Sequence, residues 1–191
     1  EAGFYLAYRA MLAEGKSGIF FGLPTNATEQ AMNPRIQQAI DAIYGTDSYN
    51  VSHAAGKSWI IDSLPSCEDK EERQFYASQK ETKLMMPFAT GTVDQIEMSV
   101  MKRKYMLISL MDLADKVVVI DEMHAYDAYM QELLKTALQW FRELHVPVVI
   151  MSATLPSTIM NEIHSVYCST PYEMSEGYPK ITQYRNGKKS E

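Results

Sequence analysis

The stretch V-V-V-I-D-E-M-H-A-Y-D, residues 117–127, predicts the architecture of this chain. Its first four residues are β-branched and apolar without alternation, which is typical of a strand buried on both faces of a parallel sheet. Asp121 and Glu122 follow where such a strand ends. Because ligands of open α/β sheets bind at the carboxyl ends of strands, this acid pair is a candidate for metal or phosphate chemistry. The alternative is a solvated pair of acids, since acidic residues are mostly exposed.

Length and composition are those of one globular domain. The chain has 191 residues, of which 46% are hydrophobic, enough for a real core. No apolar run approaches the roughly 20 residues of a membrane span and no signal segment is recognisable, so we expect a cytoplasmic protein without membrane contact. The net charge of −6 argues against coating nucleic acid by bulk electrostatics, so a nucleic-acid site would have to be local. Cys67 and Cys168 lack metal-ligand spacing, so neither a zinc site nor a disulfide framework is expected.

Apolar runs and helical periodicity alternate along the chain. They predict strands at 19–23, 88–92, 117–120 and 146–151, and less clearly at 51–53. They predict helices at 1–13, 28–44, 93–105, 107–114, 127–144 (with Asp127 as N-cap) and 157–167. The charged run at 67–83 is interpreted as a solvated excursion, and the basic run at 102–104 as the C-terminal end of a helix.

The four clearer strands end in small polar or acidic residues. Alternating strands and helices with right-handed crossovers form a parallel sheet whose strand ends share one edge. These residues should therefore converge at a ligand-binding edge. The strand ends are Pro24–Thr25, Gly91–Thr92, Asp121–Glu122 and Ser152–Thr154.

These motifs resemble those of superfamily 2 helicases. D-E-M-H at 121–124 resembles motif II, the Walker B segment, and S-A-T at 152–154 resembles motif III. L-P-T-N-A-T at 23–28 resembles motif Ia. G-T-V-D-Q at 91–95, in a position like motif Ib, together with the extensions A-Y-D and L-P, resembles one branch, the CRISPR-associated helicase-nucleases of type I systems. The resemblance covers nearly the whole chain, including G-Y-P at 177–179, and it implies an α/β fold: a RecA-like P-loop NTPase core with helices on both faces of a parallel sheet.

The resemblance also implies roles. Asp121 would hold Mg²⁺ on the phosphates of ATP, and Glu122, beside the same metal, would orient and deprotonate the attacking water. His124 would link the nucleotide to other motifs, although a histidine taken alone is more often a satisfied core or edge residue. Ser152 and Thr154 would couple the state of the bound nucleotide to the binding of nucleic acid. Single-stranded DNA would lie against Thr25, Asn26, Gly91, Thr92 and Asp94, the last of which could instead be a helix N-terminal residue without a ligand.

Three parts of the family pattern are missing from the 191 residues. No G-x-x-x-x-G-K-[ST] phosphate loop occurs. We therefore expect residues 1–170 to be a first motor domain truncated just downstream of that loop, and 171–191 to be a linker toward a second motor domain. The second motor domain and the H-D nuclease domain, which such helicases usually carry in the same protein, are also absent. The resemblance also implies a CRISPR surveillance complex as a partner. The lost phosphate-loop strand would lie beside 146–151, leaving an unpaired apolar edge.

Three rival interpretations remain. The first is the motor domain of another superfamily 2 DNA or RNA helicase, from which A-Y-D and G-T-x-D-Q separate this chain. The second is a nucleotide-free binding module with a degenerate ATPase fold, against which the retention of both Asp121 and Glu122 speaks. The third is a metal hydrolase built on D-E-x-H, which lacks the further His or carboxylate that such a site needs.

Overall fold

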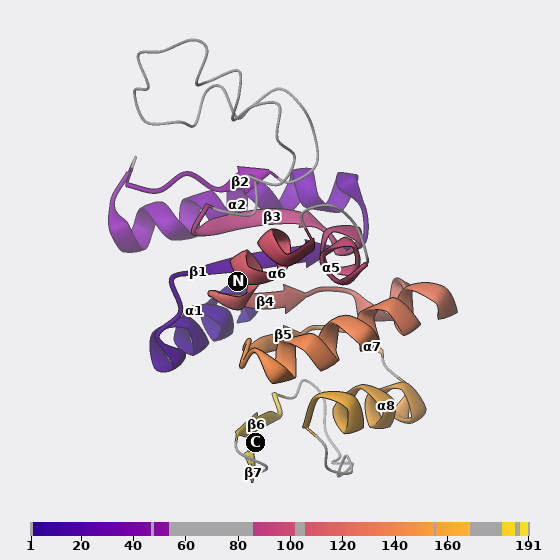
Figure 1. The fold of residues 1–191 in the computed structure, drawn as a ribbon. Helices are drawn as coiled ribbons and strands as arrows, with labels where there is room; N and C mark the ends of the chain where they lie inside the picture. The colour runs from indigo at the N-terminus through magenta and orange to yellow at the C-terminus, as the bar shows by residue number, and fades with distance from the viewer. Residues whose placement is uncertain are drawn as a thin grey trace.

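A computed structural model describes residues 2–46, 48–53, 86–101, 106–154, 156–168, 181–185 and 188–190. Within these residues the main feature is a parallel sheet of five strands in the order β2-β3-β1-β4-β5 (Figure 1). The strands are β1 (Gly18–Leu23), β2 (Ser52–His53), β3 (Phe88–Thr92), β4 (Lys116–Ile120) and β5 (Val148–Ile150). The predicted α/β class with a parallel sheet is confirmed.

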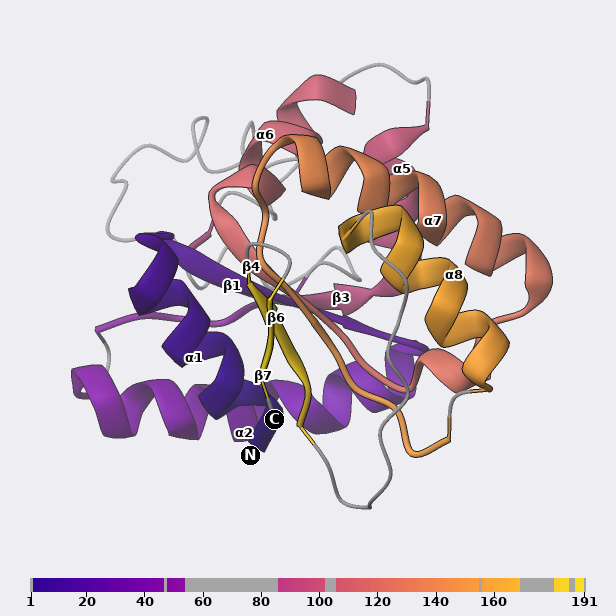
Figure 2. The ribbon, with the colours of Figure 1, turned by 90° about the horizontal axis from the view of Figure 1, so that it is seen from below.

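Helices cover both faces of the sheet, as predicted. They are α1 (Ala2–Glu14), α2 (Asn26–Tyr44), α5 (Val93–Val100), α6 (Met106–Ala114), α7 (Ala128–Glu143) and α8 (Ser157–Cys168). Figure 2 shows α1 and α2 on one side of the strands, and α5, α7 and α8 on the other. The predicted charged excursion at 67–83 and the basic run at 102–104 lie outside the described residues.

The strand residues divide between two hydrophobic cores because alternate side chains point to opposite faces. Ile19 and Phe21 of β1 pack with Val117 and the helices α1 and α2. Phe20, between them, packs with Val118 and the helices α5 to α8. All residues of β1, β3 and β4 are buried, which explains why these runs, apart from Lys116, are apolar or small rather than alternating.

Three predicted boundaries need correction. Helix α2 begins at Asn26 rather than at residue 28, because the Thr25 side chain caps it and Thr28 completes a capping box. Helix α5 ends at Val100 rather than near residue 105, because Met101 takes extended backbone angles. Strand β5 is only three residues long, although the Pro147 carbonyl already accepts from Val118 N–H at 2.9 Å.

Strand β5 lies at one edge of the sheet, where an unpaired edge was expected, and its residues are only half-buried. The predicted linker at 171–191 contains a two-stranded antiparallel hairpin that periodicity did not indicate, β6 (Gln183–Arg185) and β7 (Lys188–Ser190). Within the described part of the chain, none of the helices has the length and apolar character needed to span a bilayer.

Gly18 opens the central strand under a backbone constraint that leads to a first prediction. A Cβ atom at this position would lie 1.8 Å from the carbonyl oxygen of Pro87. The Gly18→Ala variant should lose at least about 2 kcal/mol of folding free energy, because a backbone atom cannot rotate away and the two strands must separate. The measurement is urea denaturation of the chain.

Gly22→Ala is the matched control in the same strand. Its Cβ would meet the terminal methyl of Ile96 at 2.7 Å, a flexible side-chain atom that can move. It should therefore cost less than Gly18→Ala, and equal losses would contradict the account of β1 and β3 packing.

Candidate functional site

The acid pair lies in a tight turn directly after β4, at the carboxyl edge of the sheet. Asp121 N–H donates to the Gly22 carbonyl at 3.0 Å, which extends the β1 and β4 pairing into the turn. One carboxylate oxygen of Asp121, Oδ1, accepts from Glu122 N–H at 2.8 Å. Asp121 is half-buried and Glu122 is exposed. The turn thus holds one acid against the protein and presents the other to solvent.

Glu122 adopts a left-handed backbone conformation, with φ 49° and ψ 42°. This conformation costs a non-glycine residue about 1–2 kcal/mol, so the surrounding structure must enforce it. Met123, which is 1% exposed, anchors the next position in the core, and its N–H donates to the Met151 carbonyl at 3.4 Å. Strain of this kind gathers at functional sites, where it aims a side chain.

The ionisation of Asp121 is perturbed by its position. Burial raises the pKa of its carboxyl, and the nearby Glu122 carboxylate raises it further, while the hydrogen bond from Glu122 N–H and the charge of His124 lower it. Because burial is the largest of these effects, a cation bound at Asp121 would stabilise the ionised form that the protein alone disfavours.

His124 joins the turn to the segment after β5. Its Nδ1 lies 3.0 Å from Ser152 Oγ, and the Ser152 hydroxyl donates to the Thr154 carbonyl at 3.2 Å. Ser152 Oγ therefore bridges the His124 ring and the Thr154 carbonyl. The two motifs that the sequence placed on separate strands are therefore directly hydrogen-bonded.

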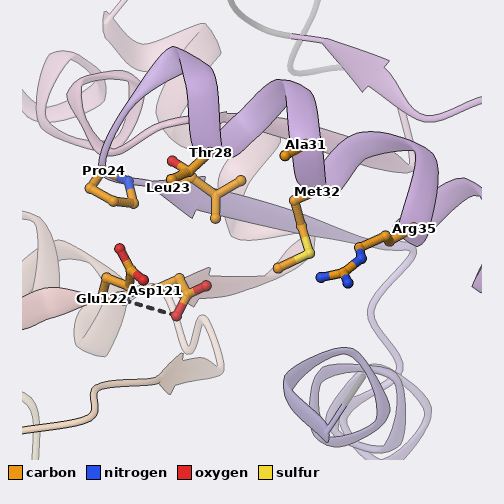
Figure 3. A pocket seen from close by; sticks show the side chains of 8 residues that line it. All are labelled: Leu23, Pro24, Thr28, Ala31, Met32, Arg35, Asp121 and Glu122. Atoms are coloured by element: carbon orange, nitrogen blue, oxygen red, sulfur yellow. Dashed lines mark hydrogen bonds between the residues drawn. The ribbon is translucent and has the colours of Figure 1, made fainter.

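A cavity of about 480 Å³ opens beside the acid pair (Figure 3). Its wall is formed by the end of β1, the start of α2 and the acid turn, through Leu23, Pro24, Thr28, Ala31, Met32, Arg35, Asp121 and Glu122. Arg35 extends from α2 toward the side of the cavity that holds Asp121. Sequence reasoning missed Arg35, because a single arginine in an amphipathic helix resembles any solvated side chain.

The predicted nucleic-acid residues lie along the same edge but differ in exposure. Thr25 and Asn26 are exposed at the start of α2, with Thr25 engaged as its cap. Gly91 and Thr92 are buried, and Thr92 Oγ1 reaches the exposed Asp94 carboxylate at 3.4 Å. The edge therefore offers Thr25, Asn26 and Asp94 as accessible side chains.

A buried polar network, not predicted from the sequence, joins α2 to β3. The Thr90 hydroxyl donates to Glu29 Oε1 at 2.5 Å and accepts from Asn33 Nδ2 at 3.0 Å. Glu29 and Thr90 are both fully buried. The network fixes the start of α2 relative to the end of β3, so these two strand-end loops are held as one unit.

The first turn of α1 lies at the same edge. A Cβ at Gly3 would come within 2.0 Å of Met151 Sδ, which places this turn against the residue that precedes Ser152. The first turn of α1 therefore packs beside the segment that leads from β5 to Ser152.

The donor set suits a magnesium ion shared with a nucleotide. Among the described residues, no group of three or more His, Cys, Asp or Glu side chains could hold a metal by itself. Mg²⁺ binds through one or two carboxylates, with phosphate oxygens and water completing its shell. Asp121 and Glu122 supply carboxylates of that kind.

Glu97 of α5 is a buried carboxyl close to this turn that the sequence did not single out. It is 5% exposed, and its Oε1 has no hydrogen-bond partner among the described residues. Burial, followed by the charges of Asp94 and Asp127, raises its pKa from 4.5 to about 7. The folded state therefore holds a proton that the unfolded chain releases.

This leads to a second prediction. Folding stability should fall as the pH rises from about 4.5 to about 7, because over that window only the folded state keeps the Glu97 proton. Glu97→Gln should remove this part of the pH dependence and raise stability at about pH 8. Asp94→Asn should shift the window to lower pH. Urea midpoints at about pH 5 and about pH 8 test this, and an unchanged slope in Glu97→Gln would contradict it.

Comparison with known proteins agrees with the fold. The sheet order and the two helical layers are those of a RecA-like α/β core. The chain matches the structure of T. fusca Cas3 with ATP at a TM-score of 0.76 and 33% identity, covering 96% of this chain and 21% of that one. No protein-family profile matches the chain.

A relative of similar sequence and a further solved structure match the same part of the chain. The CRISPR-associated nuclease/helicase Cas3 of Streptococcus thermophilus is 35% identical over 171 residues, 82% of this chain. A chain of a CRISPR RNA-guided surveillance complex in a pre-nicking state matches at a TM-score of 0.63 and 33% identity, over 92% of this chain and 17% of that one. The chain is thus a homologue of one segment of the Cas3 nuclease/helicases, and it spans 18% of the length of the Streptococcus relative.

Proposed function

We propose that this chain is part of an ATP-dependent translocase and helicase that acts on single-stranded DNA in CRISPR interference. It contributes motifs Ia, Ib-like, II and III. The observation that carries the proposal is the Asp121–Glu122 turn at the end of β4, hydrogen-bonded through His124 to Ser152. That link connects a candidate hydrolytic group to the segment after the neighbouring strand.

The two acids have different roles in this proposal. Asp121 holds Mg²⁺ through carboxylate lone pairs that its bond to Glu122 N–H leaves available. The ion, when bound, neutralises charge on the phosphates of ATP. Glu122, whose carboxylate is exposed, would orient a water molecule and accept its proton as the water oxygen bonds to the terminal phosphorus of ATP and the bond to the bridging oxygen breaks, releasing ADP. His124 completes the nucleotide-facing side of the site.

The nucleic-acid side uses the remaining strand ends. Thr25 and Asn26 offer small polar groups and helix N–H groups to phosphates of a single strand, and Gly91, Thr92 and Asp94 form the neighbouring junction between β3 and α5. Ser152 and Thr154 transmit the nucleotide state, because the His124 contact ties them to the acid turn. The similarity to a chain of a CRISPR RNA-guided surveillance complex supports such a complex as a partner of the whole protein.

The phosphate loop is absent from the 191 residues, so this chain alone should not turn over ATP. The test therefore uses the whole natural protein that contains these 191 residues. We expect magnesium-dependent ATP turnover that rises at least about tenfold with single-stranded DNA. Equal stimulation by RNA would favour a different superfamily 2 motor. Saturable DNA binding without turnover would favour the degenerate binding module.

A further inference from the structure

Tyr126 lies within the turn that carries the acid pair, and its hydroxyl has a specific partner. The residue is 4% exposed and belongs to the core on the α5 to α8 face of the sheet. Its O–H donates to the carbonyl oxygen of Asp121 at 2.7 Å. A buried phenol needs a hydrogen-bond partner, and here the partner is the backbone immediately before Glu122.

This bond completes a clamp on one peptide group. The peptide that joins Asp121 to Glu122 has its carbonyl held by Tyr126 and its N–H held by Asp121 Oδ1 (Figure 3 shows the second bond). The orientation of that peptide is set by ψ of Asp121 and φ of Glu122. Holding both of its ends therefore fixes the left-handed φ of 49° at Glu122. Without the Tyr126 bond, rotation of this peptide would relieve the backbone strain.

Tyr126 is itself held in place by helix α7. Its carbonyl accepts from Gln131 Nε2 at 2.9 Å, and its N–H donates to the Met123 carbonyl at 3.3 Å. The Asp127 side chain caps the same helix through Met130 N–H at 2.9 Å. A rigid helix is thus connected through the Tyr126 ring to the backbone of the acid pair.

We propose that Tyr126 is a positioning residue for Glu122. Through its bond to the Asp121 carbonyl, Tyr126 sets the backbone conformation that orients the Glu122 carboxylate. This rests on the proposed function of the acid pair. The expected signature is a loss in the rate of the chemical step without a loss of substrate binding, because the buried hydroxyl bonds to the Asp121 backbone and Tyr126 does not line the cavity.

The test compares two tyrosine variants in the whole natural protein. Tyr126→Phe keeps the ring and removes only the bond to Asp121. Tyr167→Phe is the matched control, because the Tyr167 hydroxyl also donates to a backbone carbonyl, that of Val146, at 2.5 Å. Val146 precedes strand β5, whereas Asp121 follows strand β4 and belongs to the acid turn. We expect kcat for ATP to fall roughly 10- to 100-fold in Tyr126→Phe with KM within about twofold. Tyr167→Phe should leave both constants unchanged.

Hydrogen exchange provides a readout that does not depend on catalysis. The Ala125 N–H donates to the Glu122 carbonyl at 2.8 Å and reports on the turn. Its exchange should accelerate at least about tenfold in Tyr126→Phe and not in Tyr167→Phe. Unchanged exchange at Ala125 would overturn the positioning role whatever the rates show.

Glu122→Gln separates this proposal from the function on which it rests. If Glu122→Gln loses turnover and Tyr126→Phe keeps the full kcat, the positioning role is wrong. If Glu122→Gln itself keeps full turnover, the proposed function fails instead, and the exchange at Ala125 still decides whether Tyr126 holds the turn. In a Glu122→Gln background, Tyr126→Phe should cause no further loss of rate, because it acts through that carboxylate.

Discussion

Glu122→Gln should lower the maximal rate of ATP turnover by the whole protein at least about 100-fold, with nucleotide affinity nearly unchanged. The amide has almost the same shape as the carboxylate, but it cannot accept a proton from water at neutral pH. Glu122 is exposed at the mouth of the cavity beside Asp121, so the substitution removes a base without creating a buried defect.

The measurement is steady-state hydrolysis of ATP together with binding of a non-hydrolysable analogue. Glu143→Gln serves as the control, because Glu143 is an exposed carboxylate at the far end of α7 that pairs with Arg142. It should leave the rate unchanged. A Glu122→Gln protein that keeps more than about a tenth of the wild-type rate would remove Glu122 from the proposed general-base role.

Phe141→Ala should cost about 3–5 kcal/mol of folding free energy. The Phe141 side chain is fully buried in the core on the α5 to α8 face, near the middle of the packing between α7, α8 and the sheet. Its removal leaves a large cavity that neighbouring side chains fill only in part. Domains have only about 5–15 kcal/mol of stability, so the variant should be close to unfolded at physiological temperature.

Trp140→Ala is the matched control one residue away on the same helix. Trp140 is 40% exposed, so truncating it should cost much less than truncating Phe141. Urea denaturation followed by circular dichroism compares the two variants. A larger loss for Trp140→Ala would contradict the orientation of α7 on the sheet.

The layered fold could be predicted from the sequence because it rests on strong local patterns. The continuous β-branched run before Asp121 is typical of a strand buried on both faces, and β4 is indeed buried throughout. The spacing of apolar residues after Asp127 likewise predicted α7 and its cap. Boundaries were less accurate where a side chain decided them, as with the reciprocal caps of Thr25 and Thr28.

The site was predictable in its residues but not in its geometry. The convergence of Asp121 and Ser152 follows from parallel topology, yet nothing in their spacing indicates that His124 bridges them. The left-handed turn at Glu122 had no local signal, because that conformation is usually marked by glycine. Tyr126 is an apolar aromatic in the pattern, and only the fold shows that its hydroxyl reaches the backbone of Asp121.

The buried carboxyls escaped prediction for a related reason. Glu29 and Glu97 occur in helices where an acidic residue is usually exposed. Their burial depends on how α2 and α5 pack against the sheet, which is a tertiary property. Arg35 is exposed, as its sequence context indicates, and only the fold shows that it lines the cavity beside the acid pair.

The central claim is that Asp121 holds the metal of a nucleotide site at the end of β4. Anomalous scattering from Mn²⁺, in crystals of the whole protein with a non-hydrolysable ATP analogue, tests it most directly. We predict a Mn²⁺ peak about 2–4 Å from the Asp121 carboxylate, either in direct contact or through one water molecule. A metal peak elsewhere, with nucleotide bound and the Asp121 carboxylate free of metal, would contradict the account.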